Sequence, residues 1–313
     1  MTETPALRAA ETPALLAAET PALLAAETPA LRAIAPGISL IAGVPLPANK
    51  VNGARNANVV VVSGPAGSIV WNGGVSHQHG QQLLQSIQSQ ASGPLKALII
   101  NRAFQDVLFG WSAFAAVGIP VWMHTSAIDM MRRRCSSCLA NLGNLLGKQV
   151  MAGTRLAEPT QVLTGGMQFD SIGRKLEILD FGLTSGPNDL MLYDRENQVL
   201  LSGALIFTNH LNRIENANIA AWIAALNKTL QLPVRVVVPD YGAPAGRNAI
   251  IQTRDYLVQL SARVSRLLKD QVGLLELTAN GQLNNFSQWD AYAENHPRNL
   301  QTVYLQEENA LFR

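Results

Sequence analysis

The sequence predicts an α/β fold in which two mixed β-sheets pack face to face between outer helices, an αββα sandwich. Three observations favour this class: early strands form a hairpin, later strands alternate with helices, and the chain is apolar. Hydrophobic residues make up 48% and charged residues 15% of the 313 residues. This length can bury one large core or two smaller ones, and the pattern after residue 35 fits one domain with a tail.

The first half of the domain begins with strands. A β-rich run at 38–42 predicts the first strand. Two more runs, 58–63 and 68–71, flank Gly64-Pro65-Ala66-Gly67, which is a turn signal for a hairpin. Apolar periodicity then predicts a helix over 81–90 and a buried strand over 95–101.

The second half alternates strands with longer helices. Helices are predicted over 109–117, 127–146, 217–230 and 250–268, and strands over 119–123, 175–179, 190–193, 199–201 and 234–238. Trp222 is expected on the buried face of its amphipathic helix. We therefore divide the chain into a leader (1–35), a domain (36–275) and a tail (276–313). The tail is expected to pack on the domain and to turn at Asn295-His296-Pro297.

The leader is an octapeptide repeat. Units of the form Glu-Thr-Pro-Ala-Leu begin at Glu3, Glu11, Glu19 and Glu27. Thr suits an N-cap and Pro a first helical position, but the next Pro ends each unit before a stable helix can form. We interpret the segment as a low-complexity leader; the alternative is a Leu-rich arm that docks onto a partner. It lacks the basic start of a secretory signal, so a cytoplasmic protein is expected.

The charge pattern excludes some classes of partner. Lys and Arg number 24 and Asp and Glu 22, with no basic stripe of the kind that binds nucleic acid. The cluster at 132–134 is interpreted as a solvated helix face. No apolar run reaches membrane-spanning length. The expected partner is an unidentified protein or small molecule.

One loop, residues 101–110, follows a buried strand and precedes a helix. It resembles the metal-binding loop of the metallo-β-lactamase superfamily, His-x-His-x-Asp-His-x-x-Gly. Other segments resemble that family in the same order, namely 71–74, 151–154, 158–160, 186–190, 200–207 and 237–242. The nearest subgroup is identified as the quinoprotein-relay (SoxH-like) zinc hydrolases, from residues 135–139, 151–154 and the Trp222 helix. The resemblance covers about residues 38–275 and implies the αββα fold.

The resemblance also implies a centre of two zinc ions, but the ligand positions have changed. Those seven positions hold Arg102, Phe104, Asp106, Val107, Ser185, Ala204 and Tyr241. Zinc is bound by Cys, His and carboxylate groups, so only Asp106 is an ordinary ligand. With six of the seven positions non-ligating, we expect no metal cofactor.

The surviving carboxylate of Asp106 needs a partner if it is buried. One hypothesis pairs it with Arg102, four residues earlier, as a replacement for the lost metal charge. The alternative is that Arg102 points to solvent and Asp106 caps the following helix. The remaining replacements are the apolar residues Phe104, Val107 and Ala204. They would fill the former metal site or exclude water from it.

Two further groups of residues are candidates for chemistry. His77 and His79 could form a relocated metal site with Asp106, although both suit a polar helix start. Cys135 and Cys138 form a C-x-x-C pair that is open to three interpretations: an inherited structural pair, a thiol switch or a metal site. His124, His210 and His296 are interpreted as structural or exposed single residues, and Ser185 has no evident base.

Three functional hypotheses follow. The first is a metal-free pseudoenzyme, a former hydrolase scaffold used for binding, assembly or regulation. The second is an enzyme with a non-standard metal site, or with Asp106, Asp240 and Tyr241 as acid and base groups. The third is a redox module that uses Cys135 and Cys138. On the sequence alone, no residue is assigned as catalytic.

Overall fold

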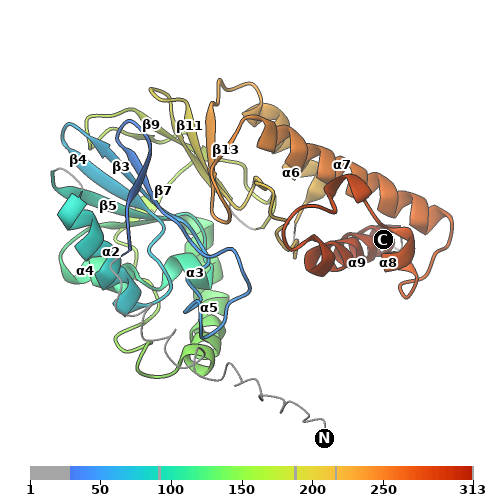
Figure 1. Cartoon of the computed structure of the whole chain (residues 1–313), viewed down its shortest axis with the longest axis horizontal. Helices are drawn as coiled ribbons and strands as arrows, with labels where there is room; N and C mark the ends of the chain where they lie inside the picture. The colour runs from blue at the N-terminus through green and yellow to red at the C-terminus, as the bar shows by residue number, and fades with distance from the viewer. Residues whose placement is uncertain (1–28, 91–92, 187–188, 216, 312–313) are drawn as a thin grey trace, which may run out of the picture.

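The protein is described by a computed structural model that covers residues 29–90, 93–186, 189–215 and 217–311. Within these residues, a seven-stranded sheet and a six-stranded sheet lie face to face, with helices on their outer sides (Figure 1). The predicted αββα class is therefore confirmed. The repeat starts at Glu3 to Glu27 lie outside the described residues. In the described part of the chain, no helix combines the length and apolar character needed to cross a bilayer.

The first sheet changes from antiparallel to parallel along its width. Its strands, in spatial order, are β1 (Arg32–Ala35), β2 (Ile38–Ile41), β3 (Val59–Gly64), β4 (Gly67–Trp71), β5 (Leu95–Ile100), β6 (Val121–His124) and β7 (Gln161–Leu163). Neighbours from β1 to β4 pair antiparallel, and those from β4 to β7 pair parallel. The expected hairpin joins β3 to β4. Gly67 has φ 139°, and a Cβ there would lie 2.4 Å from the Pro94 carbonyl oxygen.

Helices cover the outer face of this sheet because their crossovers connect its parallel strands. They are α2 (His77–Gln90), α3 (Gln105–Leu108), α4 (Trp111–Ala116) and α5 (Thr125–Leu146). Phe109, Trp111 and Phe114 are buried in the core between these helices and the sheet. The start of the first sheet lies inside the expected leader, because β1 pairs with β2 and Ile34 packs on the core.

The second sheet is mostly antiparallel. In spatial order it contains β13 (Ala245–Gly246), β12 (Val236–Pro239), β11 (Val199–Gly203), β10 (Leu190–Asp194), β9 (Leu176–Asp180) and β8 (Gln168–Phe169). Only β11 and β12 pair in parallel. Outside this sheet lie α6 (Ile219–Thr229), α7 (Asn248–Lys269), α8 (Leu277–Asn280), a 3-10 turn (Asn284–Phe286) and α9 (Tyr292–Leu311) (Figure 1). Trp222 is buried on α6 as expected, and its indole donates to the Leu205 carbonyl at 2.9 Å.

The C-terminal helices share a core with α6 and α7. Rings of Phe207, Tyr256 and Trp289 meet edge to face or tilted, with centroids 5.9–6.0 Å apart. The expected turn at residues 295–297 is wrong, because α9 runs through it. His296 is buried there, stacks on Tyr292 with centroids 4.5 Å apart and hydrogen-bonds the Tyr256 hydroxyl at 3.1 Å. This burial outweighs the loss of one helical hydrogen bond at proline.

Each end of the sandwich has a buried arginine. At one end, Arg174 pairs with Asp194, with Nη2 and Oδ2 2.7 Å apart. Its guanidinium also donates to the carbonyls of Ser63 (2.9 Å) and Pro36 (3.0 Å), so it links the second sheet to β3 and to the β1–β2 turn. At the other end, the parallel strands β4, β5 and β6 finish near the ends of β11 and β12. Ligand sites of α/β proteins commonly lie at such carboxyl ends, and the candidate residues gather here.

Candidate functional site

Asp240, directly after β12, is the centre of a buried polar cluster between the two sheets. Its side chain is 1% exposed. Asn72, at the end of β4, donates its amide to Oδ1 at 2.9 Å. Asn101, at the end of β5, donates to Oδ1 at 2.9 Å and to Oδ2 at 3.0 Å. Asn72 reaches this position with φ 73°, a left-handed conformation that asparagine tolerates better than most residues. The carboxylate, which the second sheet carries, is thus held by two strand ends of the first sheet.

Arg102 fills the space beside Asp240. Its side chain is 9% exposed, and its Nε lies 3.3 Å from Asp240 Oδ2. Nη2 donates to the hydroxyl of Tyr241, and the guanidinium carbon lies 4.1 Å from the centroid of the Phe104 ring. The expectation that Arg102 points to solvent is therefore wrong. A buried guanidinium needs a carboxylate, and Asp240 supplies it.

Asp106 joins the cluster through Tyr241. The Tyr241 hydroxyl donates to Asp106 Oδ2 at 2.6 Å, while it accepts from Arg102. The proposed pairing of Arg102 with Asp106 thus takes an indirect form, because the direct ion-pair partner of Arg102 is Asp240. The alternative role of Asp106 as a helix cap is wrong: it lies in the first turn of α3, whose N-cap is Phe104.

Burial and charge act in opposite directions on this cluster. Burial lowers the pKa of Arg102, but the acidic groups around it, Tyr241, Asp240, Asp106 and Asp189, outweigh burial and raise that pKa above its ordinary value. Burial raises the pKa of Asp106 and of Asp189, and it raises the pKa of Tyr241 well above its ordinary value. Arg102 is therefore a permanent cation, and Tyr241 is a neutral hydrogen-bond donor.

Ser185 belongs to a neighbouring part of the cluster. Its hydroxyl donates to Asp189 Oδ2 at 2.7 Å, and the same oxygen accepts from the Thr184 hydroxyl (2.9 Å) and the Gly186 amide (2.8 Å). The positive charge of Arg102 lowers the pKa of Asp189 against the effect of burial. Ser185 thus acts as a hydrogen-bond donor to the Asp189 carboxylate and has no imidazole beside it in these contacts.

The remaining vestigial positions are apolar. Val107 and Ala204 are buried. Phe104 is 37% exposed, and the Arg102 guanidinium stacks over its ring. The structure therefore brings Arg102, Phe104, Asp106 and Tyr241 together. Sequence reasoning missed three residues that complete the cluster, Asn72, Asn101 and Asp189. The signal for the two asparagines is their position immediately after buried strands that end at the same edge.

The two early histidines face other partners. His77 Nδ1 lies 2.9 Å from the Ser112 hydroxyl, and the His77 amide donates to the Thr154 hydroxyl at 3.0 Å. His79 Nδ1 accepts from the Val75 amide at 3.3 Å, and burial lowers the pKa of His79 to about 3. In the ranges that the structure covers, no group of three or more His, Cys, Asp or Glu is placed to hold a metal ion. The hypothesis of a relocated site at His77, His79 and Asp106 is not supported by these contacts.

The zinc pair that the family resemblance implies does not fit these residues. Zinc needs imidazole, thiolate or carboxylate donors that converge on it. Arg102 instead places a cation next to Asp240, and two cations at such short range repel each other strongly. The nearby carboxylates of Asp240 and Asp189 already accept several hydrogen bonds.

The thiol pair lies on α5, and Cys135 contacts the loop that carries Arg102. Both cysteines are free, and Cys135 is buried with its Sγ 3.7 Å from the Ala103 carbonyl oxygen. Burial, reinforced by the neighbouring Cys138, raises the pKa of Cys135 to about 12. Cys138 is partly exposed, with its Sγ 3.6 Å from the Arg134 carbonyl oxygen. A thiol with so high a pKa is a weak nucleophile at neutral pH.

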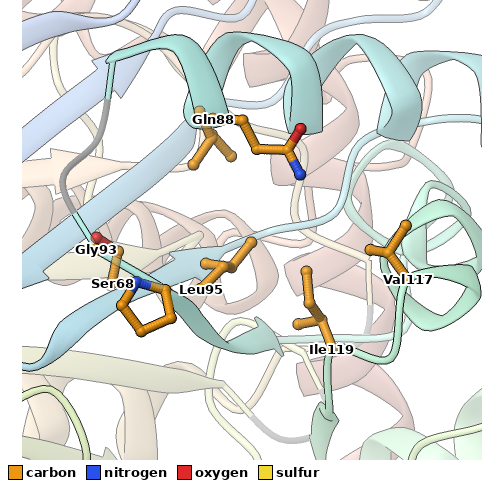
Figure 2. Close-up of a pocket in the computed structure, with 8 residues that line it drawn as sticks. Ser68, Gln88, Gly93, Leu95, Val117 and Ile119 are labelled. Carbon is orange, nitrogen blue, oxygen red and sulfur yellow. The ribbon is translucent and has the colours of Figure 1, made fainter.

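A cavity of about 320 Å³ lies where β5 begins, at the end of the first sheet opposite the polar cluster. Gln88, Leu95, Val117 and Ile119 line it together with Ser68 (Figure 2). The lining combines polar and apolar side chains, and none of the candidate residues from the sequence is part of it. The polar cluster and this cavity are therefore separate features.

Comparisons with known proteins agree on the fold. No family model matches the chain, and no curated protein matches it by sequence. A metallo-beta-lactamase from Pontibacter korlensis is similar in structure, with 17% identity, a TM-score of 0.60, and coverage of 73% of this chain and 98% of that one. A metallo-beta-lactamase from Hirschia baltica has 19% identity and a TM-score of 0.52, with coverage of 72% and 96%.

A larger share of this chain aligns with a stereoselective inverting sec-alkylsulfatase from a Pseudomonas species. The two are 16% identical with a TM-score of 0.70, and the alignment covers 88% of this chain and 50% of the sulfatase. This chain thus spans about half the length of that enzyme. Identities this low establish a common architecture and leave the activity open. The chain has the metallo-β-lactamase fold.

Proposed function

We propose that the chain is a catalytically degenerate metallo-β-lactamase-fold protein that acts in binding, assembly or regulation and has no metal-dependent hydrolase activity. The observation that supports this proposal is the Arg102 guanidinium, which is buried against Asp240 where the resemblance places metal ligands. We further infer from the matching sequence segments that the quinoprotein-relay zinc hydrolases are the nearest subgroup. The cell compartment inferred is the cytoplasm.

Displacing the arginine would be costly. A metal at this place would have to remove Arg102 from Asp240 and Tyr241 and leave the guanidinium without its partners. Breaking a buried ion pair by removing one partner costs about 3–5 kcal/mol. The metal would gain few ligands in return, because Phe104, Val107 and Ala204 have no donor atom. The cluster therefore suits a structural role.

The two alternatives have weaker support. Acid and base chemistry by Asp106, Asp240 and Tyr241 requires groups that substrate can reach and that change protonation near neutral pH. Asp240 is fully enclosed, and burial raises the pKa of Tyr241 well above its ordinary value. A redox role for Cys135 requires a thiolate, which its raised pKa disfavours.

Metal analysis of the full chain tests the proposal. The purified protein would be incubated with Zn²⁺, Mn²⁺ or Fe²⁺, desalted and analysed for bound metal by mass spectrometry, with Asp240→Asn as the matched variant. We expect far less than one metal per chain in both proteins. Near-stoichiometric metal that the variant loses would overturn the proposal. So would turnover of a lactam, thioester or sulfate ester that a chelator abolishes.

A separate experiment tests the binding role. Candidate ligands, or a co-purifying protein identified by mass spectrometry, would be titrated against the full chain and against a variant without residues 1–28. We expect saturable binding, and its weakening by the truncation would support the repeat arm as a docking element. A failure of every titration would contradict the binding role.

A further inference from the structure

A serine, a histidine and an aspartate line up beside the buried cluster. His124 is the last residue of β6, and Ser126 is the second residue of α5. His124 Nδ1 lies 2.5 Å from the Ser126 hydroxyl oxygen. On the other side of the ring, His124 Nε2 lies 3.2 Å from Oδ2 of Asp180, the last residue of β9 in the other sheet. A hydroxyl, an imidazole and a carboxylate in this order form a charge-relay-type triad.

The hydrogen bonds determine which ring nitrogen can act as a base. The backbone amide of Ser126 donates to His124 Nδ1 at 3.4 Å. Because an amide can only donate, Nδ1 must accept, and the ring proton of the neutral imidazole is therefore on Nε2, facing Asp180. The electron pair of Nδ1 is then shared between the Ser126 amide and the Ser126 hydroxyl, which is the closer of the two. This is the tautomer that a nucleophilic serine requires, with the roles of the two nitrogens exchanged relative to serine proteases.

The carboxylate of Asp180 is held in place from two directions. Its Oδ1 accepts from the Gly182 amide at 2.8 Å, which leaves Oδ2 for the histidine. A Cβ at position 165 would lie 2.7 Å from the Asp180 Cβ, so the glycine there leaves the space that the aspartate occupies. The His124 and Asp180 side chains are 18% and 22% exposed. Both side chains are therefore partly exposed.

The start of α5 adds a favourable place for negative charge. The helix has 22 residues, and Ser126 lies in its first turn. The first amides of an α-helix lack intrahelical acceptors, and the helix dipole stabilises an anion beside them. An oxyanion that forms next to the Ser126 hydroxyl would lie near these amides. The same elements therefore place a nucleophile, its base and a source of oxyanion stabilisation together.

We propose that Ser126, His124 and Asp180 form a metal-independent hydrolytic site for small carboxylic esters. Ser126 Oγ attacks the ester carbonyl carbon as its proton passes to His124 Nδ1. The bond to the leaving alkoxide breaks, and Nδ1 returns the proton to give the alcohol. Water then attacks the acyl-serine, Nδ1 takes and returns its proton, and a carboxylic acid leaves. The reaction consumes one ester and one water, and Asp180 stabilises the imidazolium.

This inference does not rest on the proposed function, because it involves different residues and no metal. A capping role for His124 explains its contact with the Ser126 amide. It does not explain why Asp180 of the other sheet holds Nε2. The chain also contains a natural comparison: Ser112 contacts His77 Nδ1 at 2.9 Å but is 3% exposed. Among the described residues, His77 makes no ion pair with a carboxylate.

The test is covalent labelling of the full chain by a fluorophosphonate probe, followed by peptide mass spectrometry. We expect the label on Ser126 and none in Ser126→Ala. Asp180→Asn should slow labelling by roughly a hundredfold, because Asp180 holds the general base His124 in its productive tautomer and stabilises the imidazolium. Ser112→Ala is the matched control and should label at the unchanged rate. Thermal unfolding of each variant shows that it is folded.

Hydrolysis of p-nitrophenyl acetate in the presence of a chelator supplies the second readout. We expect a burst of nitrophenol that requires Ser126 and survives the chelator. A merely structural role for the three residues would leave labelling and burst unchanged in Asp180→Asn, which would overturn the inference. A label on another serine would do the same. Chelator-sensitive turnover, in contrast, counts against the proposed function, so the two failures are distinguishable.

Discussion

Two polar clusters lie at the same edge of the sandwich and differ in how far they are closed. Around Asp240, the side chains of Asn72, Asn101 and Arg102 meet the carboxylate, and Asp240 is 1% exposed. Around His124, the chain of contacts ends at a serine hydroxyl, and the side chains are 18–22% exposed. A closed cluster suits stability because the buried charges of Arg102 and Asp240 pair with each other, whereas chemistry requires a reactive atom that a substrate can reach.

The largest expected effect is the loss of stability in Arg102→Ala, which breaks the closed cluster. Removing the guanidinium leaves Asp240 buried without its cation, so the free energy of unfolding should fall by about 3–5 kcal/mol. Denaturant titration measures this change. Arg102→Lys keeps the charge but loses the planar contacts of the guanidinium. Its free energy of unfolding should therefore lie between those of the wild type and Arg102→Ala. An unchanged free energy in the alanine variant would mean that the asparagines alone hold Asp240.

An intermediate effect is expected in the open cluster from Gly165→Ala. The added Cβ would displace Asp180 and thereby misorient His124, because it would lie 2.7 Å from the Asp180 Cβ. We expect labelling of Ser126 to slow about tenfold, which corresponds to about 1.4 kcal/mol. Gly143→Ala on α5 is the control, since its Cβ would meet nothing within 4 Å. Equal labelling rates in the two variants would show that the position of Asp180 does not affect the reaction of Ser126.

The smallest effect is expected from Asp106→Asn at the rim of the closed cluster. Burial raises the pKa of Asp106, so the folded chain holds its proton more tightly than the unfolded chain. This contribution to stability is full below the unfolded pKa of about 3.9 and is lost as pH rises through the folded value.

The asparagine side chain of the variant does not ionise, so the variant does not lose this stability as pH rises. Its carbonyl oxygen can still accept from the Tyr241 hydroxyl. At pH 7 the variant should therefore be as stable as the wild type or more stable, by no more than about 1 kcal/mol. The difference should vanish near pH 3.5. Urea titration at both pH values measures it. A clearly weaker variant at pH 7 would show that Arg102 depends on the charge of Asp106 as well as on Asp240.

The place of the polar cluster could be predicted from the sequence, whereas the pairing of its side chains could not. Strand and helix periodicities, together with the loop at 101–110, predicted the two-sheet fold and the edge where Arg102, Asp106 and Tyr241 meet. Spacing suggested Asp106 as the partner of Arg102 because the two are close in sequence. The actual ion-pair partner, Asp240, comes from the other sheet, and Tyr241 is 139 positions from Arg102. Local spacing carries no information about such pairings.

The same limit applies to the open cluster. The sequence indicates that His124 follows a strand, and on that basis it was interpreted as a single structural or exposed residue. Its carboxylate partner, Asp180, ends a strand of the other sheet, so only the packing of the sheets places the two together. The missed asparagines, Asn72 and Asn101, are polar residues after buried strands, a position that is more informative once the sheet order is known.

The Arg174–Asp194 pair gives the molecule a mechanical property that neither cluster has alone. Arg174 pairs with Asp194 within the second sheet and donates to the carbonyls of Ser63 and Pro36 in the first, so the two sheets are linked at the end opposite Asp240 as well as at Asp240 itself. Separating the sheets would break the buried Arg102–Asp240 ion pair at one end and the hydrogen bonds of Arg174 to Ser63 and Pro36 at the other. Separation of the two sheets is therefore strongly opposed, so a binding partner meets a stiff frame. Rigid-body docking is the mode of association that such a frame favours.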